Sequence, residues 1–186
     1  MRYNLIVSLC RNSGIGNKYQ LPWHIKQDLN YFAKLTKGDG NNAVIMGNKT
    51  WQSLPIVKGK PRGLPYRDNL VLARVDSFDM VLNHDQLLKT YKTIDELETY
   101  LSCNQNYEDI WIIGGANVYK QFLDMNKIQK CYVTYIDEDF DCDTFFPIDF
   151  KTSGEWKEIE CNDTYDTNYE CTVSYLVYER CISSII

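Results

Sequence analysis

Apolar residues in this chain fall into short runs that alternate with stretches in which they recur every three or four positions. The short runs predict buried strands, and the periodic stretches predict amphipathic helices. Such an alternation of strands and helices is typical of an α/β fold built on a largely parallel, buried sheet. The expected strands cover residues 3–10, 43–46, 69–74, 80–82, 109–113 and 130–136.

Four helices are expected between these strands, at about residues 25–36, from 49, from 94, and at 117–123. The third follows Thr93, which stands three residues before Glu96 as in a capping box. Residues 55–65, rich in proline, glycine and basic side chains, predict a loop. The tail predicts an antiparallel hairpin with arms at 155–161 and 172–179 and a long loop between them.

The composition is that of one globular domain over residues 1–186, with 44% hydrophobic and 24% charged residues. A domain of this size buries roughly 70% of its unfolded surface and needs no disulfide or metal to fold. The net charge of −5 argues against a general electrostatic grip on nucleic acid. An acidic protein still binds an anion through a few local cations, so the positions of the basic residues matter more than their sum.

The seven cysteines and two histidines are scattered without a CxxC pair, so no metal site is expected. The odd cysteine count and an N-terminal apolar run too short for a signal sequence indicate reduced thiols in the cytoplasm. No apolar run approaches the roughly 20 residues of a transmembrane helix, so no membrane association is expected.

A glycine pair, Gly114-Gly115, follows the predicted strand 109–113 and precedes a predicted helix. Without Cβ atoms the backbone lets a phosphate approach closely, and the N–H groups that begin a helix attract anions. The pair also suits a plain tight turn, and the third glycine of a GxGxxG fingerprint is absent. A dinucleotide pyrophosphate site and a simple turn therefore both remain open.

Two cations stand at the ends of other predicted strands. Lys49 follows Gly47 near a helix start, where its ammonium could meet a phosphate, and Arg74 ends the strand 69–74, where a guanidinium could hold a ribose phosphate with two bonds. The alternative for each is a solvated surface cation.

Asp28 lies at positions i, i+4 and i+7 with Phe32 and Leu35 on the predicted helix 25–36, so an acid shares a face with two apolar residues. If it is buried there, its pKa rises and it becomes suited to proton transfer near neutral pH. If it lies at the rim, it only stabilises the helix start through the dipole.

Arg67 stands just before a predicted strand. A lone arginine there is usually solvated, but its guanidinium also matches a substrate carboxylate.

Six short motifs, in order along most of the chain, resemble those of dihydrofolate reductases. They are Gly14-Ile15-Gly16 with Leu21-Pro22-Trp23 and Asp28; Val44-Ile45-Met46-Gly47 with Lys49-Thr50-Trp51; Asn69-Leu70-Val71-Leu72 with Arg74; Trp111-Ile112-Ile113-Gly114-Gly115 with Val118-Tyr119; Val133-Thr134; and Asp143-Thr144-Phe145-Phe146-Pro147.

The resemblance implies a single α/β domain with a mixed, mostly parallel eight-stranded sheet flanked by helices. It implies NADPH-dependent reduction of 7,8-dihydrofolate to 5,6,7,8-tetrahydrofolate, by hydride transfer with protonation of the pterin, in support of thymidylate, purine and one-carbon metabolism. Such an enzyme binds antifolates in place of its substrate and works as a monomer or fused to thymidylate synthase.

By the same resemblance, Asp28 is the acid of the pterin pocket, and Trp23 and Thr134 are catalytic neighbours that orient its network. Arg67 would hold the substrate's glutamate carboxylate, and residues 16–21 would form a mobile loop over the nicotinamide. The implied pocket walls are Ile6, Val7, Phe32, Leu54 and Ile113, with the backbone carbonyls of Ile6 and Ile113 facing the pterin. The implied cofactor contacts are Val7, Ile15, Gly16, Leu21, Gly47, Asn48, Lys49, Thr50, Leu72, Ala73, Arg74, Ile113, Gly114, Gly115, Ala116, Asn117, Val118 and Tyr119.

The chain departs from the family pattern at three places. Asn48 stands where a basic residue is common, and Ala73 where a serine often helps to bind phosphate. Tyr66 and Gly63, in the loop before Arg67, stand where glycine and proline are frequent.

Two other functions remain as alternatives. One is a reductase on a related scaffold that acts on a pyrimidine of riboflavin synthesis, which is not expected to pair a buried Asp28 with Arg67. The other is a non-catalytic nucleotide-binding protein, which is expected to lack the acid.

Overall fold

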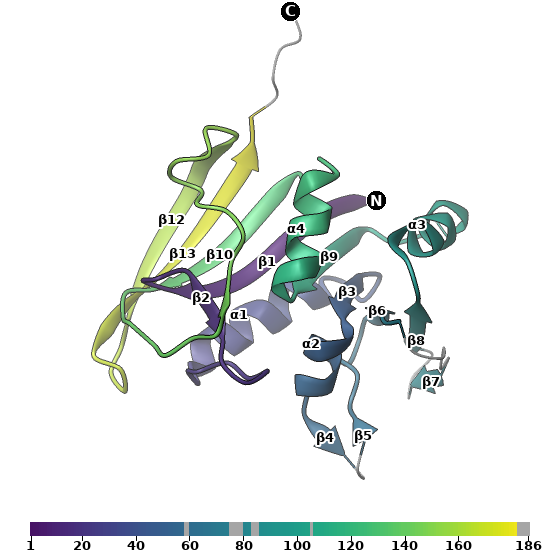
Figure 1. The fold of residues 1–186 in the computed structure, drawn as a ribbon, viewed down its shortest axis with the longest axis horizontal. Helices are drawn as coiled ribbons and strands as arrows, with labels where there is room; N and C mark the ends of the chain where they lie inside the picture. Colours follow the sequence, from purple (N-terminus) through teal and green to yellow (C-terminus); the bar gives the residue numbers. More distant parts are fainter. Residues whose placement is uncertain (58–59, 75–79, 83–85, 105, 182–186) are drawn as a thin grey trace, which may run out of the picture.

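The structure is a computed structural model that describes residues 1–57, 60–74, 80–82, 86–104 and 106–181. Its centre is one mixed β-sheet (Figure 1), in which eight strands are extended at one edge by a short ninth. In spatial order the strands are β12 (Trp156–Asp166), β13 (Cys171–Arg180), β10 (Lys130–Ile136), β1 (Arg2–Cys10), β9 (Asp109–Gly114), β3 (Ala43–Gly47), β6 (Asp68–Leu72), β8 (Gln86–Tyr91) and β7 (Met80–Leu82).

The six strands from β10 to β8 are parallel to one another, and β13, β12 and β7 are added antiparallel at the two edges. The predicted mixed, mostly parallel sheet is confirmed, as is the α/β class. Parallel strands are buried on both faces, which explains why β1 and β9 appear in the sequence as nearly continuous apolar runs.

Helices lie on both faces of the sheet. In Figure 1, α1 (Lys26–Lys37) lies behind the sheet, whereas α4 (Ala116–Asp124) crosses in front of it. Apolar side chains of α4 and of α3 (Ile94–Cys103) pack with one face of β1 and β9 in the largest core cluster. The opposite layer joins Phe32 and Leu35 of α1 to the sheet, together with Trp51 of the short helix α2 (Asn48–Ser53).

Within α1, Leu29 also stands at helical spacing from Phe32, yet it is not part of the buried face. Leu29 is 40% exposed, whereas the neighbouring Asp28 is only 6% exposed. The buried line on this helix therefore runs through an acid, and this brings the carboxylate to the sheet.

Several elements differ from the prediction. The tail arms are longer than expected, and only residues 167–170 connect β12 to β13 in place of a long loop. The predicted first arm ends at residue 161, and residues 162–165 of β12 are all exposed, so that no apolar alternation marks them as a strand. The predicted loop 55–65 includes a small hairpin of β4 (Ile56–Val57) and β5 (Lys60–Pro61).

Strand β8 was not predicted at all, and neither was the pairing of β2 (Gly14–Gly16) with β11 (Thr144–Phe145). Both depend on partners distant in sequence, which a local pattern does not contain. Among the described residues, no helix is long and apolar enough to cross a membrane.

Candidate active site

The carboxyl ends of three neighbouring parallel strands, β9, β3 and β6, lie side by side. The side of the sheet on which these strands end is its C-terminal edge. In the ladder Met46 of β3 lies beside Gly114 of β9, and Gly47 of β3 lies beside Leu72 of β6. This register brings three segments distant in sequence, 47–50, 72–74 and 114–119, to the same edge. Ligands of open parallel sheets bind at such an edge.

The glycine pair forms a turn that a side chain would block. Gly114 has φ 106°, a left-handed conformation that favours glycine, and a Cβ on it would lie 2.9 Å from the Tyr119 ring. Gly115 is the N-cap of α4, and no side chain caps that helix start. The first N–H groups of α4 are therefore suited to an anion, as the sequence predicts.

Two of the cations predicted for this edge are exposed, as a phosphate ligand requires. Lys49 lies in the first turn of α2, and its ammonium is 4.8 Å from the centre of the Tyr19 ring. The Thr50 hydroxyl would lie 3.5 Å from a Cβ on Gly115, which places α2 beside the glycine turn. Arg74 follows β6 and is exposed.

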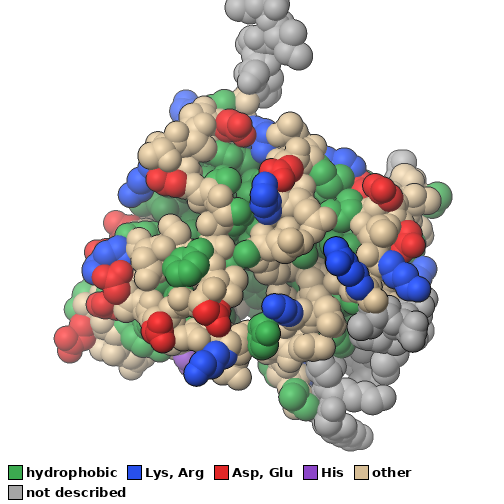
Figure 2. Space-filling view, viewed as in Figure 1, with side chains coloured by type: hydrophobic (Ala, Val, Ile, Leu, Met, Phe, Trp, Pro, Cys, Tyr) green, Lys and Arg blue, Asp and Glu red, His purple; other side chains and the backbone are tan. Residues whose placement is uncertain are grey.

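The surface charge is mixed on this side of the molecule. Figure 2 shows acidic side chains around β2 at the lower left and basic side chains near the centre and right of the same face. A negative ligand would therefore depend on local cations such as Lys49, in a protein whose net charge is −5.

On the other side of the sheet, Asp28 lies in the first turn of α1, beside paired strands. Ser8 of β1 and Thr134 of β10 are direct partners in the ladder, and both side chains influence the pKa of Asp28. Burial raises the pKa of Asp28, and the neighbouring Thr134 and Ser8 side chains oppose that rise without cancelling it. The buried form of Asp28, one of the two alternatives, is the one observed.

Tyr119 connects the glycine turn to the region of Asp28. Its ring packs against Gly114, and its hydroxyl donates a 2.8 Å hydrogen bond to the Ile6 carbonyl. Burial, and then the charges of Cys131 and Asp28, raise the pKa of this hydroxyl. A position predicted for the cofactor thus contacts one predicted for the substrate.

The predicted pocket walls mostly share one apolar layer. Ile6 is buried in the cluster on the α1 side of the sheet, with Phe32, Leu54 and Ile113 packed against it. Val7 instead belongs to the cluster on the α4 side, since neighbouring residues of a strand face opposite ways. Ile6, Phe32, Leu54 and Ile113 therefore lie in one layer, and Val7 lies in the layer on the opposite face of the sheet.

Arg67 is buried at the edge of this layer, with 3% of its surface exposed. Its Nε donates to the Pro65 carbonyl at 2.9 Å, its Nη1 donates to the Thr36 hydroxyl, and its guanidinium carbon is 6.0 Å from the Phe32 ring centre. Burial lowers the pKa of Arg67 to about 10. A desolvated guanidinium of this kind is a strong site for a carboxylate.

The loop before Arg67 keeps a glycine-like conformation although a tyrosine occupies the position. Tyr66 has φ 65°, and the Lys37 ammonium lies 4.9 Å from its ring centre. Tyr66 stands where glycine is frequent in the family, but this difference does not prevent Arg67 from lying buried beside Phe32.

The segment expected to close over the site is tied to a distant loop. β2 pairs with β11, the Asn17 amide donates to the Asp141 carbonyl at 2.9 Å, and the Lys18 N–H donates to the Asp143 carboxylate at 2.9 Å. Leu21 at the end of this segment is 48% exposed. No sequence signal indicated these contacts, because they join residues more than a hundred positions apart.

Trp23 is buried, and its ring lies edge-on to Phe140 with centroids 5.1 Å apart. Among the residues that the structure describes, none accepts a hydrogen bond from its indole N–H. A buried donor in this state suits an ordered water or a ligand atom.

The chain is similar to known proteins over most of its length. A family model described as dihydrofolate reductase matches residues 2–180. A dihydrofolate reductase of Drosophila melanogaster is 41% identical over 154 residues, which cover 79% of this chain and 80% of that protein. One of Aedes albopictus is 37% identical over 154 residues, which cover 78% and 79%.

Some relatives are longer than this chain. A bifunctional dihydrofolate reductase-thymidylate synthase of Daucus carota is 34% identical over 152 residues, which cover 78% of this chain but 28% of that protein. The match therefore covers only part of that larger protein. Together with the family model, these similarities show that the chain belongs to the dihydrofolate reductase family of enzymes.

Proposed function

We propose that the protein reduces 7,8-dihydrofolate to 5,6,7,8-tetrahydrofolate with NADPH, by hydride transfer and protonation of the pterin. The observation that carries the proposal is a buried carboxylate, Asp28, in an apolar layer that Tyr119 connects to an uncapped glycine turn. The Asp28 carboxylate in its apolar layer suits a pterin that must gain a proton, and the glycine turn suits the phosphates of a dinucleotide.

NADPH fits the residues at the sheet edge. The N–H groups at the start of α4 would hold the pyrophosphate beside Gly114 and Gly115, and Thr50 lies next to them. Lys49 and Arg74 would supply positive charge for the phosphates, with Arg74 on the adenosine ribose phosphate, which favours NADPH over NADH. When bound, the cofactor supplies the hydride, and the protein supplies position and electrostatics.

The substrate fits the layer beneath α1. A pterin between Ile6, Phe32 and Ile113 would turn its amino group and the adjacent ring nitrogen to the Asp28 carboxylate, which can accept both N–H groups. The glutamate carboxylate would meet Arg67 at the far end of the same layer. Leu54 and Phe32 would exclude water between the two charged groups.

Asp28 would favour a protonated pterin ring. A carboxylate in a dry pocket interacts more strongly with a positive charge than one in water, so it raises the proton affinity of the ring beside it. Thr134 would hold its orientation. Trp23 would hold the water that delivers the proton, since its buried indole N–H suits such a partner.

A reducing compartment such as the cytoplasm is part of the proposal, because all seven cysteines are free thiols. Supply of tetrahydrofolate for thymidylate, purine and one-carbon metabolism would follow from the reaction.

The test is to mix the purified protein with NADPH and dihydrofolate and to follow the loss of NADPH absorbance. We expect oxidation that requires dihydrofolate, that is slower with NADH, and that a low concentration of an antifolate abolishes. A protein that binds NADPH but leaves its absorbance unchanged with dihydrofolate would contradict the proposal. Oxidation driven instead by a pyrimidine of riboflavin synthesis would favour the related reductase.

A further inference from the structure

Thr36, in the last turn of α1, is fully buried at the point where Arg67 enters the apolar layer. Its hydroxyl donates to the Phe32 carbonyl at 2.7 Å and accepts from Nη1 of Arg67. A hydroxyl has one proton, so the bond to Phe32 turns its lone pairs toward the guanidinium. Nothing in the motifs of the sequence points to this threonine.

We infer that Thr36 is a positioning residue for the substrate: it holds Arg67 in the orientation that receives the glutamate carboxylate. The inference rests on the proposed function, since it assumes a substrate with that carboxylate. With Nε of Arg67 held by the Pro65 carbonyl at 2.9 Å and Nη1 held by Thr36, two edges of the planar head group are fixed. The side chain then loses little conformational freedom when a carboxylate arrives.

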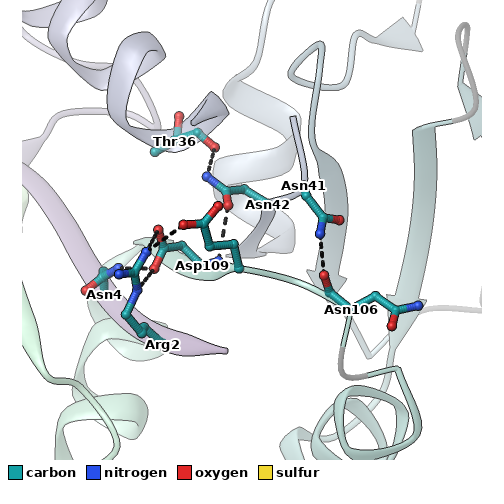
Figure 3. A network of polar contacts seen from close by, with 8 residues as sticks. Arg2, Asn4, Thr36, Asn41, Asn42, Asn106 and Asp109 are labelled. Atoms are coloured by element: carbon teal, nitrogen blue, oxygen red, sulfur yellow. Dashed lines mark hydrogen bonds and ion pairs between the residues drawn. The ribbon is translucent and has the colours of Figure 1, made fainter. Parts of the chain in front are cut away.

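The backbone of the turn that contains Thr36 is also hydrogen-bonded, through the side chain of Asn42. Figure 3 shows the Asn42 side chain donating to the Thr36 carbonyl, at 3.2 Å, and accepting from the Asp109 N–H, at 3.1 Å. The Asp109 carboxylate in turn accepts from Arg2 at 2.7 Å and from Asn4 at 3.1 Å. Hydrogen bonds thereby connect the end of α1 to the starts of β9 and β1, and they fix the position of the Thr36 backbone.

The surroundings make the hydroxyl more than a packing group. Arg67 is 3% exposed, and burial lowers its pKa to about 10, so the guanidinium is held with little water around it. A buried charged donor without an acceptor is unfavourable, so the side chain is expected to rotate toward another acceptor. Without the Thr36 hydroxyl, the head group would rotate away from the position that faces the substrate.

The experiment compares two substrates in Thr36→Val, which has nearly the same shape but no hydroxyl. One is dihydrofolate, and the other is a 7,8-dihydropterin without the benzoylglutamate tail. We expect the KM for dihydrofolate to rise by about five- to tenfold, the effect of one buried hydrogen bond, with kcat within about twofold. The KM for the tailless pterin is expected to stay unchanged, because it has no carboxylate for Arg67.

Three further variants make the result specific. Thr36→Ser keeps the hydroxyl and is expected to restore the wild-type KM. Thr36→Val added to Arg67→Leu is expected to have no further effect on KM. Thr99→Val is a matched control, since the Thr99 hydroxyl donates to the Asp95 carbonyl at 2.8 Å in the same way but on the exposed surface of α3. It is expected to leave both KM values unchanged.

Thr36→Ala gives the same readout if the valine methyl group does not fit beside the guanidinium. The inference is overturned if the variants change KM equally for both substrates, or if Thr36→Ser behaves like Thr36→Val. It is also overturned if the effect persists in the Arg67→Leu background. A wild-type protein that reduces neither pterin would instead defeat the proposed function, so the two failures are distinguishable.

Discussion

At the scale of single residues, Asp28 combines a charge with a buried position, and this has a consequence for stability. Its pKa is raised by burial in the folded protein, above the ordinary value of 3.8 that applies to the unfolded chain. Between the two values the folded state binds more protons than the unfolded state, so stability falls as the pH rises through this window. At neutral pH the carboxylate is therefore a cost to folding.

We predict that Asp28→Asn is more stable than the wild type at pH 7 and that the difference shrinks as the pH falls toward 4. The measurement is chemical denaturation of both proteins without ligands at several pH values. An Asn variant that is less stable at pH 7, or whose advantage grows in acid, would show that the hydrogen bonds to the carboxylate outweigh its desolvation.

Arg67 is the second residue whose role can be isolated. Arg67→Leu is predicted to raise the KM for dihydrofolate by about 10- to 150-fold, the effect of removing a hydrogen bond to a charged group. The KM for NADPH should change little, since Arg67 lies among the substrate-side residues beside Phe32. Steady-state kinetics with each ligand varied in turn test this. If the KM for NADPH changed more than the KM for dihydrofolate, Arg67 would belong to the cofactor site, and its assignment to the substrate would be wrong.

Asp28 could be singled out on sequence because its helical spacing sets it on an apolar face. Whether it is buried or at the rim depends on the neighbouring strands, and spacing alone left both possibilities open. Thr36 could not be found in this way, because a hydroxyl carries no periodic signal and its partner Arg67 lies 31 positions along the chain.

At the scale of elements, α3 offers the clearest agreement between sequence and geometry. Thr93 accepts from the Glu96 N–H at 3.2 Å, and the Glu96 carboxylate accepts from the Lys92 N–H at 2.8 Å, which is close to the predicted capping box. Residues 94–103 are helical, as their capping residue predicts.

Thr93→Ala is predicted to lower the free energy of unfolding by about 1 kcal/mol, the usual effect of losing an N-cap side chain. Thr99→Ala in the middle of the same helix is the control, and it should be neutral or stabilising because alanine is the better helix former. Urea denaturation of the two variants makes the comparison. Equal losses of stability in both would mean that the cap contributes nothing specific.

Elements with strong local signals could be predicted, and those defined by distant partners could not. The strand at 130–136 has the bounds that its apolar run suggests, and the helix at 117–123 differs by one residue at each end. The second half of β12 and the pairing of β2 with β11 were missed because they are made by partners rather than by periodicity.

At the scale of the whole molecule, the parallel sheet is what assembles the site. Its register brings Gly47, Leu72 and Gly114 to one edge, while Asp28 and Arg67 both lie in the α1 layer. The motifs along the chain predict which residues belong to the site, and that assignment stays a prediction. Their geometry could not be foreseen, because it depends on strand order, which no local pattern specifies.

The most direct test of the account is the rate of NADPH-dependent dihydrofolate reduction by Asp28→Asn compared with the wild type. At neutral pH we predict a loss of kcat on the order of 10²–10⁴-fold, the usual contribution of general acid catalysis, with NADPH binding unchanged. The loss should shrink in acid, where solvent can protonate the pterin directly. An Asp28→Asn enzyme that turns over at the wild-type rate at neutral pH would contradict the role given to this carboxylate.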